Sequence, residues 1–382
     1  MPKALGKEAP PKKAAQVGKK PAAKKVKTAP KKTAEPILDS LYQLPKASDV
    51  YLWCDYIELR CLVHPDKQFS RQDLIEAIDD SRSAGVELEE VSAETDYEED
   101  GDITEELAEN DNDGEDNDEV KAVPANDRRE TKAADLFASI DARSNLFGIA
   151  YPFELADAGH RLVLKHAFND EQSLYLQLLL SSSLKFVPKT RRKELTAPFE
   201  YLSAKIFRGL MPTGWEVHQF GAANSTRYHG HLYKRMEALA ADWRATHVLK
   251  RENYTTTNSG DGGLDLVAWH PLGDDGRVGI PLAAAQCGCS ATEWQLKPLE
   301  ASPATLNTKL WVQHPWATYY FMPQDLLKPQ DAGFDWQRRD KLVRSIVIDR
   351  LRIVRLARQF GITADYAIPS LAVSEAAAMA LE

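Results

Sequence analysis

The sequence predicts an α/β protein in which helices flank a central mixed β-sheet, with a small N-terminal α+β unit and disordered tails. Two observations support this prediction. Short apolar segments of strand length alternate with longer segments of helical period across the second half of the chain. Two long tracts carry charge of almost one sign and hold too little apolar surface to join a core.

The two charged tracts lie at residues 1–35 and 86–120. The first is rich in Lys, Ala and Pro, and its eleven Lys oppose only Glu8 and Glu35. This composition predicts a disordered tail that either binds phosphates without sequence specificity or only keeps the chain soluble. The second tract holds eighteen Asp or Glu and no Lys or Arg, which predicts an extended linker over 86–125. The remaining 37 basic and 37 acidic side chains balance, so the net charge of −9 identifies no partner.

A small α+β unit is expected between these tracts, over residues 36–85. Residues 49–63, DVYLWCDYIELRCLV, predict a strand, and the PDK that follows predicts a turn. Ser70 is a candidate N-cap for a helix over 70–80 that has acid early in its first turns. A helical region is expected over 126–195, where the Leu-rich EQSLYLQLLLSSSL predicts a buried helix.

The main domain is expected over residues 196–382. Thr196 is a candidate cap for its first helix, which has Pro198 in its first turn and one apolar face. That face carries Phe199, Leu202, Ile206, Phe207 and Leu210. The elements predicted after it are a helix over 229–245, strands over Leu264–Trp269, Val278–Gln286 and 316–322, and a long helix over Trp336–Arg358.

Cysteine usage and hydropathy restrict the compartment. Four cysteines are too few and too irregularly spaced for a disulfide framework or a zinc ribbon, which indicates a reducing compartment, the cytoplasm. The most apolar stretch, Leu174–Leu184, is too short to cross a bilayer, so no membrane partner is expected. The chain holds no P-loop, G-x-S-x-G or H-E-x-x-H motif, so a phosphatase or nucleotidase is poorly supported.

Polar side chains stand at the adjoining ends of two predicted strands. In GDGGLDLVAW, Asp265 opens one strand after two glycines, which let the backbone and a nucleic-acid strand come close. In AAAQCG, Gln286 ends the next strand and Cys287 can add a backbone carbonyl. Oxygen ligands of this kind suit Mg²⁺ or Mn²⁺, which can turn a bound water toward a phosphodiester.

These two segments resemble the core of the PD-(D/E)xK nuclease superfamily, and within it the Mrr-like restriction endonuclease branch, over roughly residues 200–320. The resemblance implies a restriction-endonuclease-like core. It matches Asp265 to the metal-binding aspartate, Gln286 to the (D/E/Q) position and Glu200 to the acid on the preceding helix. Asp261 is a weaker candidate at the same rim.

The chain departs from the family pattern at one position. The family places a lysine two residues after the glutamine, where this chain has Gly288. In some members the lysine comes from the following helix, so we expect Lys297, on a helix beginning near Ala291, to supply the positive charge.

The function that the resemblance implies is a Mg²⁺-dependent DNA endonuclease, a bacterial restriction or anti-phage effector that forms a homo-oligomer or acts with a defence-system partner protein. Its expected catalytic residues are Asp265, Gln286, Lys297 and Glu200, and its expected metal ligands are Asp265, Glu200 and Cys287. If Lys297 points away from the strand ends, the alternative is a catalytically degraded nuclease-fold protein that binds nucleic acid or serves as a scaffold.

Simpler interpretations of the same residues stay open. Asp261 and Asp265 can cap a turn before a strand, and Gln286 can bond backbone groups at a strand end. Lys297 can be an ordinary surface lysine. On the long helix, one third of the circumference carries basic residues, which suits contact with DNA phosphates or a solvated charged face. These residues are Arg338, Lys341, Arg344, Arg352 and Arg355.

Overall fold

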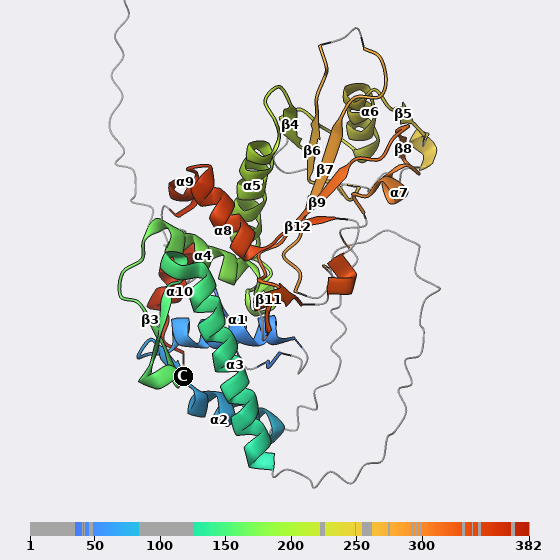
Figure 1. The fold of residues 1–382 in the computed structure, drawn as a ribbon. Helices are drawn as coiled ribbons and strands as arrows, with labels where there is room; N and C mark the ends of the chain where they lie inside the picture. Colours follow the sequence, from blue (N-terminus) through green and yellow to red (C-terminus); the bar gives the residue numbers. More distant parts are fainter. Residues whose placement is uncertain are drawn as a thin grey trace, which may run out of the picture. The chain divides into compact units, whose positions relative to one another are not determined.

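Residues 36–382 form one compact unit, which Figure 1 shows as a ribbon. The computed structural model describes residues 35–39, 41, 43–45, 49–83, 125–221, 226–248, 250–253, 262–273, 276–291, 294, 297, 300–330, 333–337, 339–342, 345–367 and 371–381. The charged tracts predicted to be a disordered tail and a linker therefore lie almost wholly outside the described residues. Within the described residues, none of the helices has the length and apolar character needed to span a bilayer.

A five-stranded mixed sheet forms the centre of the second half of the chain, which confirms the predicted α/β class. Its strands are β4 (Glu216–Gln219), β6 (Leu266–Trp269), β7 (Leu282–Cys287), β9 (Ala317–Phe321) and β12 (Ile346–Ile348). They lie side by side in chain order. β6 runs antiparallel to β4 and β7, whereas β7, β9 and β12 run parallel to one another. The three strands that the sequence predicted here are all present.

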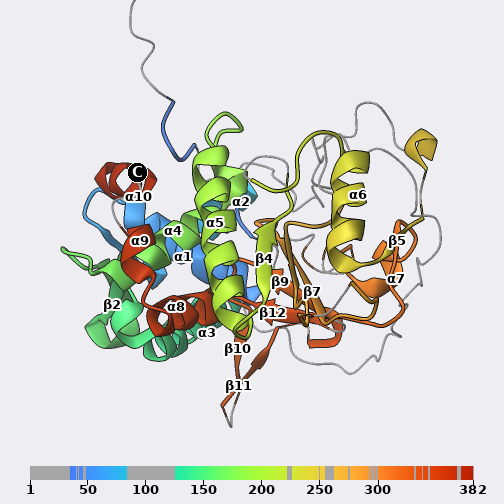
Figure 2. The ribbon, with the colours of Figure 1, turned by 90° about the horizontal axis from the view of Figure 1, so that it is seen from above.

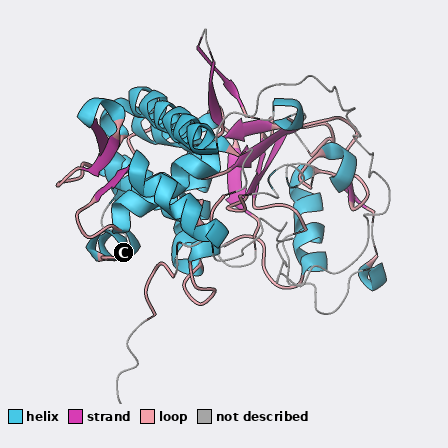
Figure 3. Cartoon of the chain, turned by 90° about the horizontal axis from the view of Figure 1, so that it is seen from below, coloured by secondary structure: helices cyan, strands magenta, loops and turns pink. Residues whose placement is uncertain are grey.

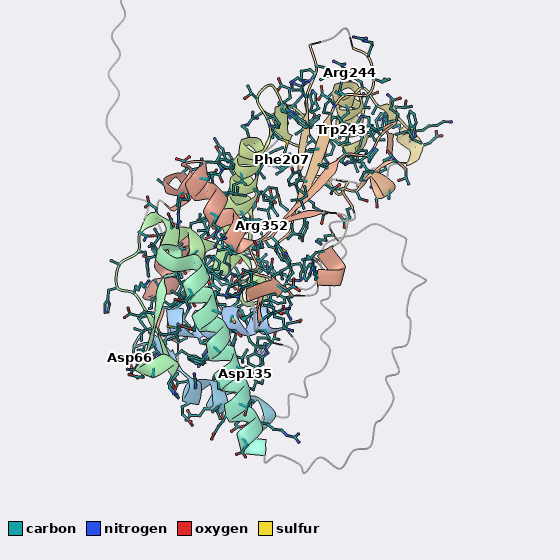
Figure 4. All side chains as sticks on the ribbon, viewed as in Figure 1. Asp66, Asp135, Phe207, Trp243, Arg244 and Arg352 are labelled. Carbon is teal, nitrogen blue, oxygen red and sulfur yellow. The ribbon has the colours of Figure 1, made fainter. Side chains whose placement is uncertain are left out.

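Helices cover both faces of this sheet, α5 (Lys193–Leu210) on one and α6 (Leu232–Trp243) on the other (Figure 2). Alternation along the strands explains the two layers, because successive side chains point to opposite faces. Ala285 packs in the cluster that contains the apolar face of α5, and Ala284 packs in the cluster that contains α6. Figure 4 labels Phe207 of α5 and Trp243 of α6, one residue from each layer.

Helices and one small sheet make up the first half of the unit. Its elements are α1 (Val50–Val63), β1 (Gln68–Ser70), α2 (Arg71–Ser83), α3 (Ala125–Phe147), β2 (Phe153–Ala156), β3 (Arg161–Leu164) and α4 (Asp170–Ser181). β3 pairs antiparallel with both β1 and β2. The segments before and after the acidic tract therefore share one sheet, and a single apolar cluster extends from Ile37 to Ala376.

Eight further elements complete the unit, and Figure 3 shows strands of the central sheet lying between helices. They are β5 (Thr246–His247), α7 (Pro303–Leu306), β8 (Leu310–Trp311), β10 (Leu327–Gln330), β11 (Gly333–Trp336), α8 (Arg350–Gln359), α9 (Thr363–Ala367) and α10 (Leu371–Ala378). β5 pairs with β8, and β10 forms a hairpin with β11.

The strand predicted over residues 49–63 is wrong, because this segment forms helix α1. Eleven of its fourteen residues are buried, including Asp55 and Glu58. A helix that is enclosed on all sides has no polar face, so its sequence lacks the 3.6-residue period that identifies surface helices. The aromatic and apolar content of such a helix resembles that of a buried strand.

The continuous helix predicted over Trp336–Arg358 is also wrong. β11 ends at Trp336, a 3₁₀ turn covers Arg339–Leu342, and β12 is an edge strand of the central sheet. Among the described residues of the predicted range, the α-helical part is α8, which begins at Arg350. The β-branched run Ile346–Ile348 favours a strand. Asp349 then caps α8, because its side chain accepts a hydrogen bond from the backbone N–H of Arg352 at 3.1 Å.

Candidate active site

Asp265 stands immediately before β6, and its backbone is hydrogen-bonded to the chain segments on either side of that strand. Its N–H donates to the carbonyl of Ala285 at 3.1 Å, and its carbonyl accepts from the N–H of Phe220 at 2.7 Å. The side chain is half-buried, and its Oδ2 accepts a hydrogen bond of 2.6 Å from the N–H of Cys287. The carboxylate is therefore fixed across the junction of β6 and β7.

Gln286 lies across the ladder from Asp265. Leu266 pairs with Ala285 in the antiparallel register, so one further step places Asp265 opposite Gln286, and opposed residues share a face. Gln286 is only 6% exposed. Its Nε2 donates to Glu300 at 2.7 Å. Its Oε1 is buried and has no hydrogen-bond partner among the described residues.

Glu200 and Asp265 approach the same pair of cysteines from different elements. Burial raises the pKa of the Cys287 thiol, and the charges of Asp265 and Glu200 raise it further. Burial, then Glu200 and Asp265, likewise raise the pKa of the Cys289 thiol. Both thiols therefore stay protonated near neutral pH, which leaves the carbonyl of Cys287 as its available metal-binding group. Helix α5 thus brings Glu200 to the end of β7.

The charge of Lys297 acts on one of these two thiols. Lys297 is half-buried, and its charge lowers the pKa of Cys289, the thiol that Glu200 and Asp265 also influence. Its carbonyl accepts a hydrogen bond from the N–H of Glu300 at 3.0 Å. The helix predicted to begin near Ala291 falls mainly on residues outside the described part of the chain.

Gly288 is the position at which the resembled family has its lysine. A Cβ added to Gly288 would stand 2.0 Å from the hydroxyl oxygen of Tyr320 on β9 and 2.9 Å from its Cζ. That contact excludes any side chain at residue 288 unless Tyr320 moves. The Tyr320 hydroxyl is itself buried and has no hydrogen-bond partner within the part of the chain that the structure describes. Burial, then Cys289, Cys287, Asp265 and Glu300, raise its pKa, so it remains a protonated donor.

Glu300 and Tyr320 also lie at this site, although neither was predicted from the sequence. Nothing in the sequence near Glu300 distinguishes it from other acids in loops. Tyr320 had a usable signal, because the parallel register pairs it with Gln286 in the neighbouring strand. Aligning the predicted strand over 316–322 beside the glutamine strand would have placed one of its two tyrosines on the same face.

The continuous helix expected to carry the predicted nucleic-acid-binding residues is not formed, because β12 and α8 occupy the described part of its range. Arg338, Arg344 and the side chain of Lys341 lie outside the described residues, as does Asp261. Arg352 and Arg355 are exposed on α8. Arg352 stacks over the ring of Trp336 at 4.6 Å.

The donor set at this site is rich in oxygen. No group of three or more His, Cys, Asp or Glu side chains able to hold a metal ion occurs among the residues that the structure describes. A metal here would instead take mixed ligands: the carboxylates of Asp265 and Glu200, the carbonyl of Cys287 and the unpartnered Oε1 of Gln286. Carboxylate, amide and carbonyl oxygens fit Mg²⁺ or Mn²⁺.

Comparisons with protein-family models, with curated proteins and with solved structures find no match to this chain.

Proposed function

We propose that this protein is a metal-dependent DNA endonuclease built on a restriction-endonuclease-like core. The observation that carries the proposal is the buried, unpartnered Oε1 of Gln286 opposite the carboxylate of Asp265. Leaving a buried polar atom unpaired costs about 1–3 kcal/mol. A divalent cation bound there would pair that oxygen and take its charge balance from Asp265 and Glu200.

The topology is consistent with the proposed core. The Asp265 strand and the Gln286 strand are consecutive in the chain and are antiparallel neighbours in the sheet, which supports the proposed core. α5 precedes both strands in the chain and carries Glu200. The charge of Glu200 raises the pKa of the Cys287 and Cys289 thiols, which supports a position for Glu200 at the same end of the sheet.

Each residue has a definite part in the proposed hydrolysis. When bound, Mg²⁺ would supply a water of lowered pKa and polarise the scissile phosphate. The N–H of Cys287 fixes one carboxylate oxygen of Asp265, which sets the direction of the other. Lys297 would stabilise the negative charge that develops on the phosphate as the bond to the leaving oxygen breaks.

The contact between Tyr320 and position 288 supports the migrated lysine. A lysine at residue 288 would collide with the hydroxyl of Tyr320, so a cation for this site has to come from another segment. Lys297 supports the proposal as that cation, because its charge acts on the Cys289 thiol, as do the charges of Glu200 and Asp265. A restriction or anti-phage role, a cytoplasmic location, and a homo-oligomer or defence-system partner belong to the proposal through the resemblance.

The decisive experiment replaces Asp265 with Ala and follows nicking of supercoiled plasmid DNA in Mg²⁺ and in Mn²⁺. We expect the nicking rate to fall on the order of 100-fold or more, because the cation loses a charged ligand. Asp135→Ala, at an exposed site on α3, is the matched control and should cut like the wild type. Metal-dependent nicking that survives in Asp265→Ala would refute the assignment.

A second function has two specific observations in its favour. The described residues contain no group of three His, Cys, Asp or Glu side chains suited to a metal, and the family's lysine position is a glycine. These features fit a nuclease-fold protein that binds nucleic acid without cutting it. Such a protein would bind plasmid DNA with an affinity that falls with salt, and neither the wild type nor Lys297→Ala would nick it.

A further inference from the structure

Helix α1 contacts the segment that carries Lys297, although the two are far apart in the sequence. Tyr51, in the first turn of α1, is 2% exposed. Its hydroxyl donates a hydrogen bond of 2.7 Å to the carbonyl of Ala291 and accepts one of 3.3 Å from the indole N–H of Trp294. Trp294 is fully buried, in the apolar cluster that also contains Tyr320. One hydroxyl therefore ties α1 to two points on the segment just before Lys297.

Tyr51 is itself anchored to the helical layer by buried charges. Its carbonyl accepts a hydrogen bond from Arg143 of α3. One turn further along α1, Asp55 accepts from Arg143 at 2.8 Å and from Arg350 of α8 at 2.7 Å. Because these partners are buried, the first turn of α1 cannot shift without breaking charged hydrogen bonds in a low-dielectric environment.

The other end of the same segment is anchored to the sheet. The carbonyl of Lys297 accepts from the N–H of Glu300, whose side chain accepts a hydrogen bond of 2.7 Å from Gln286. Lys297 thus lies between an attachment to α1 and an attachment to β7. Two fixed ends restrict the positions open to the Lys297 backbone.

We propose that Tyr51 is a positioning residue, which holds the segment Ala291–Lys297 so that the Lys297 ammonium faces the Asp265 carboxylate. The inference rests on the proposed nuclease function for its catalytic consequence. It makes the N-terminal helix a structural part of the cutting site. A displacement of about 1 Å at a reacting group can cost on the order of 100-fold in rate, so one lost hydroxyl can be measured.

The test compares Tyr51→Phe with Tyr56→Phe in the full chain. Tyr56 lies on the same helix, is equally buried, and forms no hydrogen bond to the described residues of the Lys297 segment. We expect Tyr51→Phe to lower the Mg²⁺-dependent plasmid nicking rate at saturating DNA about 10- to 100-fold. The DNA concentration for half-maximal rate should stay unchanged, since DNA contacts are not altered.

A second measurement does not depend on cutting. Hydrogen–deuterium exchange followed by mass spectrometry should show faster exchange over residues 288–300 in Tyr51→Phe, and wild-type exchange in Tyr56→Phe. Trp294→Phe, which removes the indole N–H, should behave like Tyr51→Phe. Unchanged exchange in Tyr51→Phe, or faster exchange with an unchanged rate, would overturn the positioning role. If the wild type fails to nick DNA, the nuclease proposal falls, and the exchange data still decide whether Tyr51 holds the segment.

Discussion

At the scale of single residues, the arrangement around Gly288 connects packing to chemistry. The hydroxyl of Tyr320 fills the space in which a side chain at residue 288 would begin. The charges of Asp265 and Glu300 help to raise the pKa of this hydroxyl, and Tyr320 pairs in the ladder with Gln286. A glycine at this position therefore keeps a tyrosine in the site, and a lysine cannot replace it without displacing that tyrosine.

The steric relation predicts the effect of Gly288→Ala. The added methyl would overpack the interface between β7 and β9, and we expect a loss of about 1–3 kcal/mol in the free energy of unfolding, measured by urea denaturation. Combining it with Tyr320→Phe, which removes the atom at 2.0 Å, should recover part of the loss. Gly221→Ala is the control, because its Cβ would meet its nearest heavy atom at 3.6 Å. Equal stability of Gly288→Ala and wild type would contradict the steric account.

The residue types near a strand end were predictable, but their partners were not. Asp265 and Gln286 are recognisable because each adjoins an apolar run of strand length, and the two runs are consecutive along the chain. Their opposition follows from the antiparallel pairing of β6 with β7, whose exact register the sequence did not specify. Glu300 reaches Gln286 from a segment fourteen residues away, and no local pattern specifies such a contact.

At the scale of elements, the N-cap of α8, Asp349, places a titratable carboxyl group in the core. Asp349 is 1% exposed, and its Oδ2 has no hydrogen-bond partner in the described ranges. Burial, then the nearby carboxylate of Asp325, raise the pKa of Asp349 from 3.8 to about 7. The folded protein thus holds a proton here that the unfolded chain has already released at pH 5 or 6.

This raised pKa predicts how stability depends on pH. Between about pH 4 and pH 7 the folded state binds more protons than the unfolded state at Asp349, so stability falls as pH rises through that range. Ionisation of Asp349 can lower the free energy of unfolding by at most roughly 4 kcal/mol over this range. Asp349→Asn keeps an equally good cap and removes the charge, so its unfolding free energy should fall less over that range. Parallel pH profiles of the two proteins, measured by urea denaturation, would contradict the prediction.

Predictions of element type were wrong where burial or a neighbouring element hid the usual sequence pattern. α5 and α6 each present an apolar face to the sheet, and both were recognisable from that period. α1 was not, because charged Asp55 and Glu58 are as buried as its aromatic residues. β12 was missed because its three β-branched residues lie directly before a true helix, and the combined run resembles one long amphipathic helix.

At the scale of the whole molecule, a buried ionic cluster joins helices that are distant in the chain. Arg350 of α8 donates to Asp55 of α1 at 2.7 and 3.0 Å, to Ser182 at 2.8 Å and to the carbonyl of Pro323 at 2.8 Å. Burial opposes the ionisation of Asp55, but Arg350 and Arg143 hold its pKa below the usual value. The charge on Asp55 is therefore maintained inside the core by its two partners.

Removing one partner should expose the cost of that burial. In Arg350→Met, the carboxylate of Asp55 would keep Arg143 but lose its bidentate contact, and we expect the free energy of unfolding to fall by about 3–5 kcal/mol. Arg355→Met, at an exposed position on the same helix, should change it by less than about 0.5 kcal/mol. Urea denaturation of both variants measures the difference. A loss of similar size in both would show that the buried ions do not stabilise the unit.

The sequence predicted the central mixed sheet, but not how the N-terminal segment joins it. Local apolar patterns identify the strands at residues 264–286 and 316–322, because each pattern lies within a few residues. The contacts of Asp55 with Arg350 and of Tyr51 with Ala291 join residues more than 200 positions apart. Long-range side-chain pairing of this kind leaves no periodic signature in one sequence.

The pairing of β1 with β3 has a consequence for engineering. The stretch between α2 and α3 joins two pieces that already share a sheet, an apolar cluster and buried salt bridges. If the polypeptide were interrupted there, fragments covering 36–83 and 125–382 would still have complementary surfaces to meet. When the two fragments are co-expressed as separate chains, they should reassemble into one folded unit. Fusing each fragment to one of two proteins that bind each other would then bring the fragments together and control the assembly.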